Sequence, residues 1–192
     1  MRALIGVLRS GVIGPPFRAR FTMISGFDCW ANQPALRDLE HFILTDLGTH
    51  LLDTARACFG EAASLYCQSH RTLLPEVKGE NVATLLLTMG KARTSVAIEM
   101  AYAKTPIERE FFPQTLAFVE GPLGSIEVAG DYWLRVTTKE GTRSERHAPP
   151  RYAWADPLYE IAHASIVACH RDLLSAVRGE GGGETTGADN LK

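Results

Sequence analysis

The sequence has little that would tie it to a membrane, to nucleic acid or to a zinc cluster. No two of its four cysteines (Cys29, Cys58, Cys67 and Cys169) form a C-x-x-C pair, which favours reduced, packed thiols in a cytoplasmic protein. The 20 basic and 22 acidic residues give a formal net charge of −2, so no long-range field favours nucleic acid or an anionic membrane. No apolar run is long enough to cross a bilayer, and the first residues carry no secretory signal.

The length of 192 residues is sufficient for one domain with a filled core. We interpret residues 1–192 as a single domain that begins with a helix within residues 1–12. Residues 179–192 are interpreted as a flexible glycine-rich tail that enters another helix. We expect both ends to be interruptions of a longer polypeptide.

The apolar pattern predicts helices at each end of a run of strands. Helical periodicity covers residues 2–9, 39–59 and 157–178, and the last two segments are closed by Gly60 and Gly179. Alternation begins at Phe17 and places Phe17, Ala19, Phe21 and Met23 on one buried face. Further strands are predicted at residues 65–70, 82–89, 94–103, 114–120, 125–129 and 132–138, with a last hairpin at residues 140–141.

Strands at hairpin spacing between helices predict an α+β fold, with a mainly antiparallel, open-faced sheet and helices packed on one face. The regular alternation of strand and helix that a parallel doubly wound sheet requires is not present. No G-x-G-x-x-G follows a strand, so the sequence predicts that a Rossmann domain is absent from this chain.

Residues 43–53 (ILTDLGTHLLD) are the segment with the strongest chemical signal. On an α-helix Asp46, His50 and Asp53 would fall within roughly 60° of one another, while leucines would occupy the opposite side. One face would therefore pack into the core and the other would present carboxylate, imidazole and carboxylate in a column.

A solvated helix face with an ordinary Asp–His pair is the alternative interpretation of this column, and a metal site is a third. The short side chains argue against a merely solvated face. Gly48 in mid-helix is unfavourable by about 1 kcal/mol relative to alanine, which suggests that another group approaches its backbone closely.

Three motifs in order resemble one known family. Residues 46–53 (DLGTHLLD) resemble the D-[ILV]-G-x-H-x-x-D signature of the glucose-fructose oxidoreductase/inositol dehydrogenase/MocA family. Residues 2–5 and 11–17 resemble its helix and G-x-I-G-x-[PV] link, and residues 120–127 (EGPLGSIE) resemble its G-x-x-G-x-[IL] hairpin. The similarity extends over nearly the whole chain.

The resemblance implies the C-terminal, substrate-binding and oligomerisation domain of a two-domain oxidoreductase. It also implies that residues 1–12 form a helix that links this domain to the preceding one, and that the isolated fragment is inactive. In that family a separate Rossmann domain binds NAD or NADP and carries a catalytic lysine in an E-K-P motif, so no cofactor-binding residue is expected in this chain. Carried over by position, His50 would act as general acid/base or hydrogen-bond donor to the reacting hydroxyl, and Asp46 would orient that hydroxyl or His50.

Other residues are weaker candidates for contact with substrate. Trp30 and Asn32 precede the signature helix and could line a sugar site, although Trp30 could equally anchor a loop. Asp53 could touch substrate or anchor a loop or an arginine. Arg109 could reach a substrate oxygen, and His163 lies on the final helix, but a solvated arginine and a packing histidine are the competing interpretations.

The leading hypothesis is an oxidoreductase domain that acts on a sugar, a polyol or a related hydroxy compound. A catalytically silent dimerisation or binding module is an alternative, because the open face of the sheet is available to a second copy of the chain. A third hypothesis is an NAD-dependent glycoside hydrolase of the same family. The expected partners are a small sugar or polyol and a homo-oligomer formed through the open sheet face.

Overall fold

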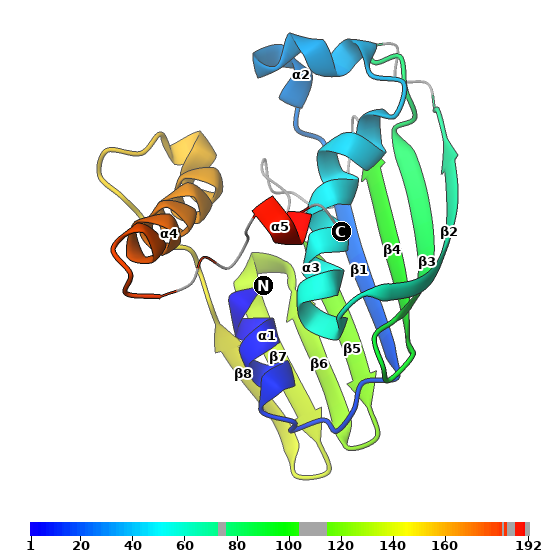
Figure 1. The fold of residues 1–192 in the computed structure, drawn as a ribbon, viewed down its shortest axis with the longest axis vertical. Helices are drawn as coiled ribbons and strands as arrows, with labels where there is room; N and C mark the ends of the chain where they lie inside the picture. The colour runs from blue at the N-terminus through cyan, green and yellow to red at the C-terminus, as the bar shows by residue number, and fades with distance from the viewer. Residues whose placement is uncertain (73–75, 104–114, 182, 184–186, 191–192) are drawn as a thin grey trace. The chain divides into compact units, whose positions relative to one another are not determined.

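The computed structural model describes residues 1–72, 76–103, 115–181, 183 and 187–190 (Figure 1). The chain divides into two compact units, Met1–Ala148 and Pro149–Lys192. The prediction that both act as one domain stays a prediction, and each unit is described by itself. In the part of the chain that the structure describes, no helix has the length and apolar character needed to span a bilayer.

The first unit is built on an eight-stranded sheet whose order is β2-β3-β4-β1-β5-β6-β7-β8. All neighbouring strands are antiparallel except β1 and β4, which run parallel. This arrangement confirms the predicted mainly antiparallel sheet. The strands are β1 (Arg18–Ser25), β2 (Ala62–His70), β3 (Val82–Met89), β4 (Thr94–Tyr102), β5 (Leu116–Gly121), β6 (Gly124–Ala129), β7 (Trp133–Thr138) and β8 (Gly141–Arg146). A short η3 turn (Gly130–Tyr132) joins β6 to β7.

Alternation along the strands separates a buried face from an open one. Every second residue of β4, from Val96 through Ile98 and Met100 to Tyr102, is at most 4% exposed. Helices α1 (Arg2–Arg9) and α3 (Thr49–Phe59) lie on this buried side, as Figure 1 shows. Leu4 and Leu51 from these helices enter the same core, so helices cover one face of the sheet as predicted.

The start of β1 differs from the prediction. Ala19 and Phe21 are buried as expected, but Phe17 lies before the strand and is 54% exposed. The backbone N–H of Phe17 donates to Glu120, and its carbonyl accepts from Ser95. The backbone of Phe17 thus extends the pairing of β1 with both of its neighbouring strands, although its side chain does not share the buried face.

The segment predicted as one helix over residues 39–59 is divided. A four-residue helix α2 (Cys29–Asn32) and a 3₁₀ turn η1 (Pro34–Asp38) precede it, and a π-helical turn η2 (Leu44–Gly48) runs directly into α3. Gly60 ends α3 with φ +87°, the left-handed region that glycine adopts without a Cβ clash. The predicted C-terminal end is confirmed, whereas the regular helical start is wrong.

The second unit contains η4 (Pro157–Tyr159), α4 (Glu160–Val177) and α5 (Gly187–Asn190). The predicted helix therefore begins with a 3₁₀ turn, and Gly179 follows its end with φ +71°. Two apolar residues of α4, Leu173 and Val177, are 59% and 77% exposed. Part of the predicted tail lies outside the described residues.

Candidate active site

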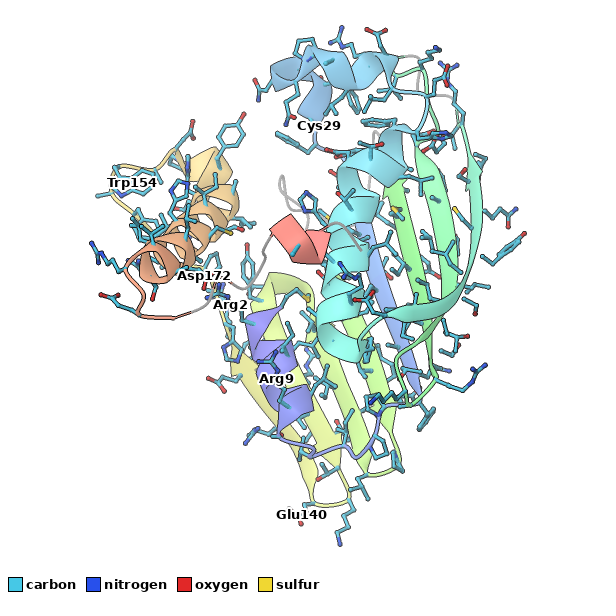
Figure 2. All side chains as sticks on the ribbon, viewed as in Figure 1. Arg2, Arg9, Cys29, Glu140, Trp154 and Asp172 are labelled. Atoms are coloured by element: carbon cyan, nitrogen blue, oxygen red, sulfur yellow. The ribbon has the colours of Figure 1, made fainter. Side chains whose placement is uncertain are left out.

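Asp46 is the one residue of the predicted column whose side chain is tied to other elements in the described part of the chain. The Tyr102 hydroxyl donates to Asp46 Oδ2 at 2.5 Å. The Cys29 thiol reaches the same oxygen with an Sγ to Oδ2 distance of 3.8 Å. Three elements therefore meet at one carboxylate oxygen: η2 supplies Asp46, β4 supplies Tyr102, and α2 supplies Cys29, which is labelled in Figure 2.

The π-helical turn places Asp46 differently from the predicted α-helical column. π turns are rare and occur frequently at functional sites. Asp46 is half-buried and reaches toward the sheet, whereas His50 and Asp53 lie exposed on α3. The regular 100° spacing assumed from the sequence does not hold through residues 44–48, because this turn closes with i→i+5 hydrogen bonds.

Gly48 does not show the close backbone approach that its position suggested. A Cβ built there would lie 3.6 Å from the Ile43 carbonyl oxygen and 3.7 Å from the Met100 side chain. These are ordinary van der Waals contacts, and Gly48 has φ −60°. The expectation of a crowded glycine was therefore wrong within the described residues.

An aromatic cluster holds the Tyr102 ring in place. Phe42 stacks on it with ring centroids 5.0 Å apart and an interplanar angle of 25°. Trp30 meets both rings edge-on, at 5.8 Å from each. All three side chains are at most 7% exposed, so the Tyr102 ring packs among apolar side chains. Only its hydroxyl group contacts a polar partner.

Burial also fixes the protonation of the two donors. It raises the pKa of Tyr102 well above its ordinary value of 10.0, and the hydrogen bond to Asp46 adds to this effect. Burial raises the pKa of Cys29 from 9.0 to about 11. Both groups are therefore protonated near neutral pH, as donation to a carboxylate requires.

Residues 80–81 hydrogen-bond both to Tyr102, which donates to Asp46, and to the start of the turn that carries Asp46. Asn81 Nδ2 donates to the Tyr102 carbonyl at 2.9 Å, and the Tyr102 N–H donates to the Asn81 carbonyl at 2.8 Å. The adjoining Glu80 carbonyl accepts from the Ile43 N–H at 3.1 Å, at the start of the π turn. Residues 80–81 therefore fix the distance between the strand that carries Tyr102 and the turn that carries Asp46.

The family of the chain follows from comparison with known proteins. Residues 1–128 match the GFO/IDH/MocA C-terminal domain family. The chain belongs to this family. The resemblance inferred from the three motifs is confirmed, and so is the fold class.

Named relatives of this GFO/IDH/MocA C-terminal domain include two D-apiose dehydrogenases. That of Paraburkholderia graminis is 41% identical over 192 residues, which are 100% of this chain and 50% of that protein. That of Rhizobium rhizogenes is 38% identical over 100% of this chain and 55% of that protein. The chain is also similar to an oxidoreductase from Agrobacterium radiobacter, which was crystallised with NAD⁺, L-tartaric acid and magnesium. The two structures superimpose with a TM-score of 0.92 and are 36% identical, over 99% of this chain and 55% of that protein. The chain spans about half the length of the relatives it matches.

The remaining predicted site residues of this GFO/IDH/MocA domain belong to different segments of the chain. Trp30 is 7% exposed, and its packing favours the loop-anchor alternative, while contact with substrate stays a prediction. Asn32 is exposed at the end of α2. His163 lies in the second unit, with its ring centroid 5.4 Å from that of Trp154. Arg109 falls outside the described residues.

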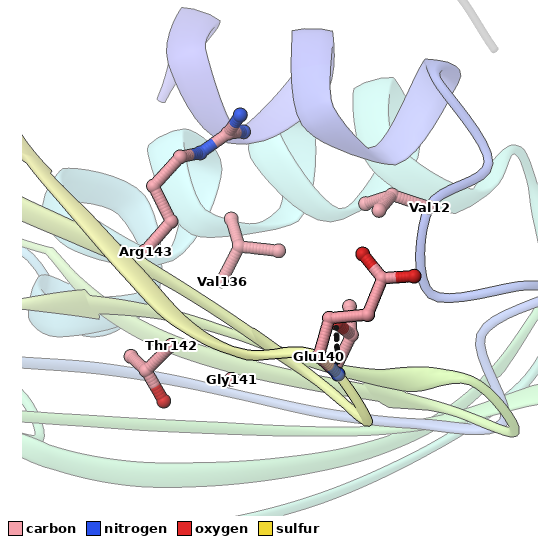
Figure 3. Close-up of a pocket in the computed structure, with 7 residues that line it drawn as sticks. Val12, Val136, Glu140, Gly141, Thr142 and Arg143 are labelled. Carbon is pink, nitrogen blue, oxygen red and sulfur yellow. Dashed lines mark hydrogen bonds between the residues drawn. The ribbon is translucent and has the colours of Figure 1, made fainter.

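Three hollows lined by described residues of the first unit include neither Asp46 nor His50 among their lining residues. The one in Figure 3 holds about 300 Å³ and is lined by Val12 and residues of the β7–β8 hairpin, among them Val136, Glu140 and Arg143. Its walls carry one carboxylate and one guanidinium but no residue of the DLGTHLLD segment. We therefore assign no catalytic role to this hollow.

The described residues also contain no group of three His, Cys, Asp or Glu side chains that could hold a metal ion. The metal-site interpretation of Asp46, His50 and Asp53 is therefore not supported by their arrangement.

Sequence reasoning missed Tyr102, Cys29 and Asn81 as parts of this site. A signal for Tyr102 was present, because the alternation of β4 places it on the buried face, where a phenol hydroxyl needs a partner. The identity of that partner depends on the packing of η2 against β4, which no local pattern reveals.

Proposed function

We propose that this chain is the substrate-side half of an NAD(P)-dependent oxidoreductase, which transfers hydride between the nicotinamide and a secondary hydroxyl of a sugar, a polyol or a related compound. The observation that carries the proposal is the DLGTHLLD segment, whose Asp46 is anchored by two buried donors while His50 stays exposed beside it. The whole-chain similarity to two dehydrogenases that are named for a sugar supports the same activity.

His50 would act as the general acid/base. Removal of hydride from a secondary alcohol leaves a proton to be accepted, and an imidazole suits that task near neutral pH. No described residue hydrogen-bonds the exposed imidazole, so it is accessible to a substrate hydroxyl. Asp46 would orient the hydroxyl or His50 from the adjoining turn.

A nicotinamide cofactor, when bound, supplies the hydride chemistry itself. The described residues do not fit a dinucleotide site of their own, because the sheet has a single parallel pair and no strand–glycine loop–helix unit. The residues of this chain would instead bind the sugar, orient its hydroxyl and hold the proton at His50. The cofactor-binding half would close over them.

Additional contacts with substrate are proposed for two exposed residues, Asn32 and Asp53. Asp53 ends the DLGTHLLD segment, and Asn32 precedes it in the sequence. Trp30, Arg109 and His163 are retained as weaker candidates. We also propose a cytoplasmic location, which the four free cysteines support. A homo-oligomer through the open sheet face is proposed as the quaternary arrangement.

The test uses the protein joined to its cofactor-binding half, with D-apiose as the first substrate and a panel of aldoses and polyols beside it. Reduction of NAD⁺ or NADP⁺ is followed by absorbance. His50→Ala is expected to lower kcat by about a hundredfold or more, because general acid/base catalysis contributes on this order. The Kd for the cofactor should not change.

His147→Ala is the matched control, since His147 pairs with Glu145 at the surface and has no proposed role. It should leave kcat unchanged. A wild-type rate in His50→Ala would show that the assignment of His50 is wrong. Cleavage of a glycoside without net formation of reduced nicotinamide would instead favour the hydrolase alternative.

A further inference from the structure

We propose that Tyr102 is a positioning residue, which acts through Asp46 by occupying one carboxylate oxygen and so directing the other toward the reacting hydroxyl or His50. The inference rests on the proposed function of Asp46. It goes beyond the D-x-x-x-H signature, because Tyr102 lies on a strand far from that motif in the sequence.

The geometry of Asp46 is asymmetric. Both hydrogen bonds that its side chain receives from described residues arrive at Oδ2, at 2.5 Å from the Tyr102 hydroxyl and 3.8 Å from Cys29 Sγ. A carboxylate held at one oxygen by two donors cannot rotate without breaking both contacts. Oδ1 is therefore left at a defined position, where it can accept a hydrogen bond from substrate.

Tyr102 is itself restrained through both its ring and its backbone. Phe42 and Trp30 contact its ring at centroid distances of 5.0 and 5.8 Å, so the ring cannot change rotamer without displacing the core. Asn81 forms hydrogen bonds with both the carbonyl and the N–H of Tyr102. A purely packing aromatic would require the ring alone, whereas this site fixes the hydroxyl.

Catalytic groups must be held close to their productive geometry, since a displacement of about 1 Å can lower a rate by about a hundredfold. Tyr102→Phe removes the hydroxyl and keeps the ring. In the protein joined to its cofactor-binding half, kcat is expected to fall roughly tenfold to a hundredfold, while KM for the cofactor stays unchanged. The substrate and cofactor are those that the wild-type protein turns over.

A double-mutant cycle with Asp46→Asn separates positioning from packing. If Tyr102 acts through Asp46, Tyr102→Phe should change the single-turnover rate less than about twofold in the Asp46→Asn background, because the group that it positions has already been altered. Single-turnover measurement keeps the slow variants within range. Tyr66→Phe, at a 63% exposed tyrosine, is the matched control and should keep the wild-type kcat.

The outcomes distinguish this inference from the proposed function. Full activity in Asp46→Asn would overturn the proposed role of Asp46 and this inference with it. An inactive Asp46→Asn beside a fully active Tyr102→Phe would overturn the inference alone, and so would equal losses from Tyr102→Phe in both backgrounds.

If Tyr102→Phe does not fold, Cys29→Ala serves as the second variant, with an expected fall in kcat of about twofold to fivefold because a thiol is a weak donor. An unchanged kcat in Cys29→Ala would then count against the inference.

Discussion

Gly48 and Gly79 both lie beside the segment that carries Asp46, but a side chain would meet different surroundings at each. At Gly79 a Cβ would lie 2.4 Å from the Leu39 carbonyl oxygen and 2.7 Å from the Glu40 carbonyl oxygen. Gly79 directly precedes the residues that anchor Tyr102 and the π turn. The backbone approach that the sequence suggested at Gly48 is found at Gly79 instead.

Alanine substitutions at these two glycines should therefore have opposite effects on stability. Gly79→Ala is expected to lower the free energy of unfolding by about 1–3 kcal/mol, because the new methyl group clashes with backbone that cannot move aside freely. Gly48→Ala should raise it by up to about 1 kcal/mol through helix propensity. Urea denaturation of both variants checks the pair. Equal destabilisation would contradict the different surroundings described for the two sites.

At the scale of secondary-structure elements, α2 is short and depends on its cap. The Asp28 side chain accepts a hydrogen bond from the Ala31 N–H at 3.1 Å, which satisfies one of the free donors at the helix start. This four-residue helix carries Cys29 and Trp30 into the cluster around Asp46. Loss of the cap should therefore lower the free energy of unfolding and change the surroundings of Trp30.

Asp28→Ala is expected to lower the free energy of unfolding by about 1 kcal/mol. It should also shift the emission of Trp30 to longer wavelength, because a frayed helix lets water reach an indole that is now 7% exposed. The emission is measured with Trp133 and Trp154 replaced by phenylalanine. Asp28→Ser keeps a capping oxygen and is the control. Equal behaviour of the alanine and serine variants would show that the cap does not hold α2.

The elements predicted most accurately are those whose pattern and packing agree. β3 was predicted at its observed bounds, because apolar residues alternate and a glycine turn follows. The π turn was not predicted, since Leu44 and Leu47 satisfy the apolar spacing of either helical form. Its hydrogen-bond pattern depends on contacts with Glu80 and Tyr102, which are distant in the sequence.

In the candidate site, too, local patterns predict some features while others depend on tertiary packing. The residue types and order of Asp46 and His50 were sufficient to indicate the family, because they form a local motif. The burial of Trp30 and the hydrogen bond of Tyr102 could not be predicted, because each depends on how α2, η2 and β4 pack together. Local patterns indicate the candidate residues, and tertiary packing decides how their side chains are held.

At the scale of the whole molecule, the open face of the sheet presents a mixed surface. Outward positions of β3 and β4 alternate with the buried core and include Thr84, Leu86, Ala97 and Glu99. Leu86 is 52% exposed, and a hollow of about 360 Å³ lies further along this face, beside Phe118. Within the described residues of the first unit, α1 and α3 cover the other side. A second copy of the chain could bury these apolar groups through the same face on both copies.

Leu86→Glu should weaken the proposed oligomer of the protein joined to its cofactor-binding half. In a two-fold interface each copy would present the new carboxylate to the other, and burial of an unpaired charge is strongly unfavourable. Sedimentation velocity should show the mass falling toward that of a single subunit, with little change in thermal midpoint because the side chain is already half-exposed. Leu123→Glu, at a 61% exposed leucine in the β5–β6 turn, is the matched control and should leave the mass unchanged. A wild-type protein that sediments as a monomer, or an equal response to both substitutions, would show that the open face does not join subunits.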